Sequence, residues 1–299
     1  QLIESVSPLL VHANSLSMSR LCGPVASQMG VPSLGHLRDM MNLSRQAIDD
    51  LNHHQRLLAV SEATRNWYQQ RGVDSHRLHV LYNGVDLEQF SPQPASGTLQ
   101  QQLGLPEEAP ILGAIGQIAL RKGWEILLAA MKQVRKQFPQ VHLVIVGERH
   151  AEKQEVIDYH RQLIESASQP ELQGHVHFLG RRDDVASLLR QWTMLVHPAR
   201  QEPLGRVLLE AAASGCPVVA TDVGGTREIF PASEGHQLRD FCFVEDVVAA
   251  ILSALHRKEA IGEIINIASG KPYKIRSIIE LVKLLIRKGQ PNYGQLAYR

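Results

Sequence analysis

The chain has 299 residues, which is enough for two domains of ordinary size. It is 44% hydrophobic and 20% charged, as in a globular protein, and its formal net charge of +1 excludes a strongly basic nucleic-acid-binding chain. Its 3 cysteines lie far apart without metal-ligand spacing, which is typical of a reducing compartment. No apolar run approaches the ~18 residues of a membrane-spanning helix, and no signal peptide is visible.

The first region, residues 1–92, alternates short β-like runs with helical stretches. Strands are expected at Leu9–Ala13, Val31–His36, Leu57–Val60 and His79–Leu81. Helices are expected to begin near Ser17, Ser44 and Ser61, because serine is a favoured N-cap residue. This alternation predicts a parallel sheet covered by helices.

The second region, residues 93–234, repeats the alternation more clearly. Strands are expected at Ile111–Ile115, Val141–Val146, His175–Leu179, Met194–Val196 and Pro217–Ala220. Helices are expected from Trp124, over 151–167, near 183–191 and from about Gly205. The pattern predicts a Rossmann-like domain.

The stretch from His197 to Glu228 sets two glutamates, Glu202 and Glu210, eight positions apart around a Pro-Leu-Gly turn. A helix that begins near Gly205 would leave the first glutamate in the preceding loop and the second inside the helix. The free N–H groups of a helix start attract anions. The predicted layout is a diphosphate at the helix start with a carboxylate on each side, which suits a nucleotide-sugar.

This block resembles the E-x7-E signature of the family 4 retaining glycosyltransferases, because loop, helix, strand and Gly-Gly turn follow in that family's order. The resemblance implies an α/β protein with the GT-B fold of two Rossmann-like domains. Residues 1–92 would be the acceptor-side domain and residues 93–234 the donor-binding domain, with the crossover at 82–92. The chain begins at Gln1 in an apolar segment, and we expect the first domain to be incomplete.

The third region, residues 235–299, resembles the C-terminal portion of the extended short-chain dehydrogenase/reductase enzymes, the nucleotide-sugar epimerases and dehydratases. The matches are RDF-x-x-V-x-D-V from Arg239 and N-I-x-S-G from Asn266. That family's T-G-x-x-G-x-x-G and Y-x-x-x-K motifs are absent, so the region is not expected to act as an oxidoreductase. We expect this region to form a small α/β tail. The chain is then interpreted as a chimera in which a glycosyltransferase is joined to this tail near residues 230–236, and the join is natural, engineered or an artefact.

Candidates for binding the leaving diphosphate are Arg121 and Lys122, in the loop ALRKG. Together with the backbone N–H groups of Gly205 and Arg206, these cations would stabilise charge that develops on the β-phosphate. Gly116, directly after the preceding strand, is expected in the same crevice. Many family members have a Gly-Arg pair after that strand, whereas this chain has glutamine at position 117.

Glu202 is expected to bind hydroxyls of the transferred sugar or to face its anomeric carbon, and Glu210 to accept hydrogen bonds from the ribose. Gly224 and Gly225, with Glu228, would close the far side of the pocket, the glycines through backbone shape more than through direct binding. His36 resembles a histidine that faces the donor sugar at the end of a family strand. It would act by hydrogen bonding or as a local base, and a structural role is an equal alternative.

By resemblance, the reaction is the retaining transfer of a sugar from a nucleotide-sugar donor to a glycan or lipid-linked acceptor in polysaccharide biosynthesis. No D-x-D motif is present, so we expect no metal, and no cofactor besides the donor substrate. A cytoplasmic location is expected, with peripheral association at the inner face of the cell membrane left open. The alternatives are a non-catalytic nucleotide-sugar-binding fragment and, less favoured, a piece of an epimerase or dehydratase.

Overall fold

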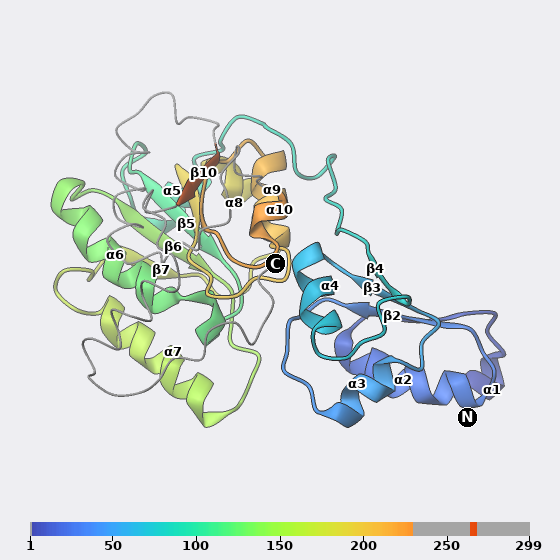
Figure 1. The fold of residues 1–299 in the computed structure, drawn as a ribbon. Helices are drawn as coiled ribbons and strands as arrows, with labels where there is room; N and C mark the ends of the chain where they lie inside the picture. The colour runs from blue at the N-terminus through green and yellow to red at the C-terminus, as the bar shows by residue number, and fades with distance from the viewer. Residues whose placement is uncertain (1, 230–263, 268–299) are drawn as a thin grey trace, which may run out of the picture.

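The computed structural model describes residues 2–229 and 264–267, which fold around two separate parallel sheets (Figure 1). The first sheet, in the blue-to-cyan lobe, has the order β1-β2-β3-β4, with strands Val11–Ala13, Ser33–Leu37, Arg56–Ala59 and Leu78–Val80. Its helices are α1 (Leu2–Val6), α2 (Leu16–Gln28), α3 (Arg45–Leu51) and α4 (Glu62–Gln69). The parallel sheet expected for this region is confirmed, and each strand lies within two residues of its expected bounds.

Serine caps begin three of these helices, as the side-chain chemistry predicts. Ser44 caps α3 and Ser61 caps α4, and both were expected. The prediction for α2 was wrong by two residues: Ser15 is the N-cap, accepting a hydrogen bond from the backbone of Met18 at 3.2 Å, and Ser17 lies inside the helix.

The second sheet has the order β10-β9-β8-β5-β6-β7, and all its pairings are parallel. Its strands are β5 (Ile111–Ile115), β6 (His142–Val146), β7 (Val176–Phe178), β8 (Met194–His197), β9 (Val218–Thr221) and β10 (Ile264–Ile267). Its helices are α5 (Thr98–Leu103), the 3₁₀ helix η1 (Leu120–Lys122), α6 (Trp124–Gln137), α7 (Gln154–Ala167), α8 (Val185–Gln191), α9 (Arg206–Ala213) and α10 (Thr226–Ile229).

Helices cover both faces of this second sheet. On one face, α6 and α7 contribute Trp124, Leu127 and Leu163 to a buried cluster with β5 and β6. On the other face, α5, α8 and α9 contribute Leu99, Leu188 and Leu208 to a second cluster with the same strands. Residues that alternate along each strand therefore enter opposite clusters, as in a doubly wound sheet.

The strand order reverses between β5 and β8. From β5 the chain builds outward through β6 and β7, and then returns to place β8 on the other side of β5. In open parallel sheets, ligands bind in the crevice outside the carboxyl ends of the strands at such a switch point. The loops that follow β5 and β8 are those that carry the candidate cations and Glu202.

Strand β10 belongs to the region expected to form a separate tail. It pairs with β9, from Ile264 opposite Val218 to Ile267 opposite Thr221. The sheet of the second domain thus includes a strand from beyond residue 234. The rest of the small α/β tail expected there, including Arg239, lies outside the described residues.

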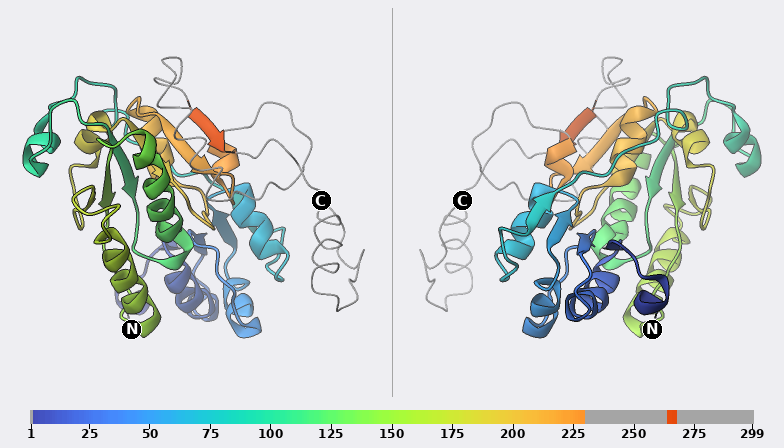
Figure 2. Two further views of the ribbon diagram at one scale, coloured as in Figure 1. Left: turned by 90° about the vertical axis from the view of Figure 1, so that its left-hand side faces the viewer. Right: turned by 90° about the vertical axis from the view of Figure 1, so that its right-hand side faces the viewer.

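The two lobes meet where α4 of the first domain faces the end of the second domain that carries α10 (Figure 1). In both side views of Figure 2, the cyan helix α4 again lies beside the orange end of the second domain. Hydrogen bonds join them directly, because the backbone N–H groups of Glu62 and Ala63 donate to the carboxylate of Glu228.

Candidate active site

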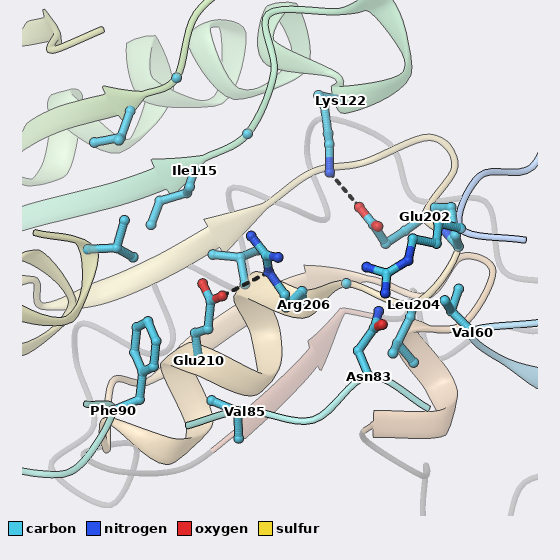
Figure 3. A pocket seen from close by; sticks show the side chains of 18 of the residues that line it. Val60, Asn83, Val85, Phe90, Ile115, Lys122, Glu202, Leu204, Arg206 and Glu210 are labelled. Carbon is cyan, nitrogen blue, oxygen red and sulfur yellow. Dashed lines mark hydrogen bonds and ion pairs between the residues drawn. The ribbon is translucent and has the colours of Figure 1, made fainter. Parts of the chain in front are cut away.

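A cavity of about 910 Å³ lies between the two domains, at the carboxyl ends of β5 and β6 and the start of α9 (Figure 3). The second domain lines it with the predicted site residues Gly116, Arg121, Lys122, Glu202, Gly205, Arg206 and Glu210. The first domain contributes Arg38, Asp39, Val60 and Asn83. Seven of the ten site residues predicted from the sequence therefore line the crevice at the switch point.

Glu202 is the most constrained carboxylate of the cavity. It is 6% exposed, and its Oε2 atom accepts hydrogen bonds from Lys122 Nζ at 2.5 Å and from His197 Nε2 at 2.9 Å. Burial alone would raise the pKa of Glu202, but the His197 hydrogen bond and the Lys122 charge outweigh burial and lower this pKa to about 2. The carboxylate is therefore charged and held in one orientation.

His197 supports Glu202 from within the sheet. Its ring is buried at the end of β8, and burial lowers the pKa of its imidazole. A carboxylate only accepts hydrogen bonds, so Nε2 of the neutral ring carries the proton. Its Nδ1 has no hydrogen-bond partner among the described residues.

Glu210 lies inside α9, whose N-cap is Gly205 with a φ of 98°. A φ in this region favours glycine, so the residue type fits the sharp turn into the helix. Arg206, one turn earlier, places Nε 3.0 Å from Glu210 Oε1 (Figure 3). Burial raises the pKa of Glu210, and Arg206 opposes that shift. Glu210 is thus a carboxylate with an exposed, replaceable counter-ion.

Besides Arg38 of the first domain and Arg206 of α9, two loops of the second domain supply cations to the cavity. Arg121 and Lys122 belong to η1, which follows β5, and Arg121 contacts only a neutral partner by hydrogen bond, Gln117 at 3.5 Å. Arg181 and Arg182 follow β7 and pair with Asp183 and Asp184. Arg121 therefore has no ion pair among the described residues and faces the cavity beside the Lys122–Glu202 pair.

Gly224 and Gly225 do not line the cavity among its described residues, but they pack beneath it. A Cβ on Gly224 would lie 1.9 Å from the carbonyl oxygen of Glu202, and one on Gly225 would lie 2.4 Å from that of Pro203. The N–H of Gly225 donates to the Glu202 carbonyl at 3.0 Å. The two glycines therefore permit a close backbone contact that fixes the loop of Glu202.

His36 lies in β2 and is not among the residues that line the cavity. Burial, with Arg38 and His12 adding to it, lowers the pKa of His36 to about 4, and both ring nitrogens lack hydrogen-bond partners among the described residues. The following residues, Arg38 and Asp39, do line the cavity. The geometry therefore favours Arg38 and Asp39 over His36 as the residues of this segment that contact a ligand in the cavity.

Sequence reasoning also gave no role to His197, Asn83, Arg181 or Arg182. His197 opens the signature block and Asn83 lies in the crossover segment, so position in a recognised motif was the available signal for both. The two arginines after β7 carry no such signal. No group of three or more metal-ligating side chains occurs within residues 2–229 and 264–267, and no helix in those ranges is long and apolar enough to cross a bilayer.

Known families match both domains. Residues 96–269 match the family described as Glycosyl transferases group 1, and residues 1–89 match Glycosyltransferase Family 4. The D-inositol 3-phosphate glycosyltransferase of Xylanimonas cellulosilytica is 33% identical over 53% of this chain and 38% of its own length. The phosphatidyl-myo-inositol mannosyltransferase of Mycolicibacterium smegmatis is 30% identical over 68% of this chain and 50% of its own length. The chain thus spans no more than half the length of these curated relatives.

Solved structures align with most of the chain. Anabaena HepE in complex with UDP-glucose aligns with a TM-score of 0.76 and 25% identity over 93% of this chain and 78% of that chain. Sucrose-phosphate synthase from Thermosynechococcus elongatus aligns with a TM-score of 0.70 and 24% identity over 96% and 75%. The two parallel sheets are those of the GT-B fold, and with more than half of its residues matched, the chain belongs to the group 1 glycosyl transferases.

Proposed function

We propose that this protein transfers a sugar from a nucleoside-diphosphate sugar to a hydroxyl group of an acceptor, with retention of the anomeric configuration. One observation carries the proposal. The interdomain cavity brings Glu202 and Glu210 together with Arg121 and Lys122 at the switch point of the second sheet. Two carboxylates suit the hydroxyls of two sugar rings, and the cations suit the diphosphate between them.

Each side chain has a role in this proposal. Glu210 accepts hydrogen bonds from the ribose, and Glu202 binds hydroxyls of the transferred sugar through the carboxylate oxygen that Lys122 and His197 leave open. Arg121 and Lys122 stabilise the negative charge that grows on the leaving phosphate, an interaction that is stronger in the transition state than in the bound donor. The N–H groups at the start of α9 add to this stabilisation.

In the transfer step, the bond between the anomeric carbon and the phosphate oxygen breaks, and its electron pair stays on the phosphate. The acceptor oxygen bonds to the same face of that carbon. Its proton passes to the leaving phosphate oxygen, so charge and atoms balance without another base. Retention follows because attack and departure share one face of the sugar.

UDP-sugars are the first donors to test, because HepE, a structural relative at 25% identity, was solved with UDP-glucose. The named relatives that use inositol phosphate or phosphatidylinositol acceptors support a polar or lipid-linked acceptor. We propose a role in glycan assembly at the cytoplasmic face of a membrane, with no cofactor besides the donor.

The test is a thermal-shift titration with UDP, GDP, ADP and their glucose conjugates, followed by mass-spectrometric assay of turnover. A ligand at a hundredfold excess over its dissociation constant stabilises the native state by about 2.7 kcal/mol. A shift with one nucleoside diphosphate, together with release of that product from its sugar conjugate, supports the proposal. Binding without turnover would favour a non-catalytic nucleotide-sugar-binding chain, and no shift with any of them would refute both.

A further inference from the structure

The N-terminus of α4, in the first domain, contacts the second domain at two places. Ser61 Oγ lies 2.5 Å from the carbonyl oxygen of Pro203, and Thr64 Oγ1 lies 3.2 Å from the same oxygen. The backbone N–H groups of Glu62 and Ala63 donate to the Glu228 carboxylate at 2.7 and 2.8 Å. The latter are charge-assisted bonds at the positive end of a helix, which is a favourable place for a carboxylate.

Both contacts adjoin the backbone of Glu202. Pro203 is the next residue, and the Glu228 helix begins directly after the Gly224–Gly225 turn, whose Gly225 N–H binds the Glu202 carbonyl at 3.0 Å. A Cβ on Gly225 would also lie 3.0 Å from Ser61 Cβ. The Glu202–Pro203 backbone is therefore clamped between the Gly-Gly turn on one side and the first turn of α4 on the other.

The carboxylate end of Glu202 has a different support. Lys122 and His197, which hold its Oε2 atom, both belong to the second domain. The backbone end, in contrast, is fixed in part by the first domain. A shift of α4 away from the second domain would remove the hydrogen bonds to the Pro203 carbonyl. The bonds of Lys122 and His197 to Glu202 Oε2 would remain. The backbone of Glu202 would then move relative to its carboxylate, which would change where the open carboxylate oxygen points.

We propose that Ser61 and Glu228 are positioning residues that link the docking of the first domain to the placement of Glu202. Glu202 then reaches its sugar-binding geometry only when α4 is docked. The part about sugar binding rests on the proposed function, whereas the mechanical link does not. Neither residue need touch the substrate, since both act through the backbone of the Glu202 loop.

The chain supplies a matched control for the test. Ser61 and Ser44 both cap a helix of the first domain, accepting from backbone N–H groups at 2.9 and 3.3 Å. Ser61 alone of this pair binds the second domain among the described residues. Ser61→Ala and Ser44→Ala therefore both lose a cap, and only the former also loses an interdomain bond to Pro203.

The first readout is amide hydrogen exchange of the ligand-free protein, which needs no substrate. Ser61→Ala should speed exchange at the Gly225 amide about tenfold, the effect of one lost hydrogen bond, while Ser44→Ala should leave it near the wild-type rate. Glu228→Gln should speed exchange at Glu62 and Ala63. The control Asp222→Asn should not, because Asp222 pairs with Arg227 inside the second domain. Equal Gly225 exchange in Ser61→Ala and Ser44→Ala would overturn the mechanical link.

The second readout is the difference in affinity between UDP and UDP-glucose, measured by calorimetry. Ser61→Ala should leave UDP affinity within about twofold and weaken UDP-glucose about tenfold, because only the sugar depends on Glu202. Ser44→Ala should change neither affinity. Equal losses for both ligands would overturn the positioning role. A wild-type protein that binds no nucleotide would refute the proposed function and leave the exchange result standing.

Discussion

Removing the charge of Glu202 should destabilise the fold far more than removing the charge of Glu210. Glu202 is 8% exposed at its side chain and pairs with Lys122, which is 9% exposed. Glu210 pairs with Arg206, which is 68% exposed. Glu202→Gln leaves a buried ammonium without a counter-ion, whereas Glu210→Gln leaves a guanidinium that water already solvates.

The expected magnitudes follow from burial. Breaking a buried pair by removing one partner costs about 3–5 kcal/mol, and because glutamine keeps one oxygen acceptor for His197 and Lys122, we expect about 3 kcal/mol for Glu202→Gln. In the i,i+4 pair of Arg206 and Glu210, Arg206 is 68% exposed and Glu210 13%, and a pair with one solvated partner contributes about 0.3–0.5 kcal/mol. Burial disfavours the charge of Glu210 and raises its pKa, so Glu210→Gln should change stability by less than about 0.5 kcal/mol in either direction.

Urea unfolding of both variants and the wild type, without ligand, measures this contrast directly. The same variants are then titrated with UDP, where Glu210→Gln should lose about tenfold or more in affinity, because the ribose loses its charged acceptor. A Glu202→Gln variant as stable as the wild type would refute the reasoning from burial. A Glu210→Gln variant with unchanged nucleotide affinity would remove Glu210 from the ribose.

Three further outcomes are expected. Lys122→Ala should weaken UDP binding more than UMP binding by calorimetry, and equal losses would contradict contact with the β-phosphate. Burial and the neighbouring His175 and His177 lower the pKa of His142 to about 4. The stability that the neutral ring contributes above pH ~6.5 should therefore be lost as the pH falls towards 4. In urea unfolding, His142→Gln should show a flatter dependence of stability on pH than the wild type, and an unchanged slope would contradict this role of His142. Gly225→Ala should lower the free energy of unfolding by about 1–3 kcal/mol, unlike Gly84→Ala, whose new methyl meets nothing within 4 Å.

The second domain could be predicted closely because its strands are buried on both faces and read as continuous apolar runs. Strand β5 and the first residue of α6 fall where the sequence places them. Helix α5 was missed, since the segment Thr98–Leu103 is short and polar apart from Leu99 and Leu103, and its ends are set by Gly97 and Gly104. The cap of α2 was misplaced because serines at 15 and 17 have equal chemistry, and only packing selects between them.

The part of the candidate site that could be predicted from the sequence is the block His197–Glu228 and the loop that carries Arg121 and Lys122. Glu202, Glu210 and Lys122 follow from spacing and order along the chain. The side chains supplied by the first domain, Arg38 and Asp39, depend on how two separate sheets are placed against each other. The same holds for the bond between Ser61 and Pro203, whose residues are 142 positions apart. Local pattern carries no information about such a contact.

Strand β10 has a consequence for where the second domain can be divided. Without it, β9 would be the last strand of the sheet and would present a row of unpaired N–H and C=O groups, which is a template for pairing with another molecule. β9 runs directly into the Gly224–Gly225 turn that clamps Glu202. A piece of this chain cut at residue 234 would therefore carry an open β edge immediately beside its candidate site, and we expect such a piece to self-associate.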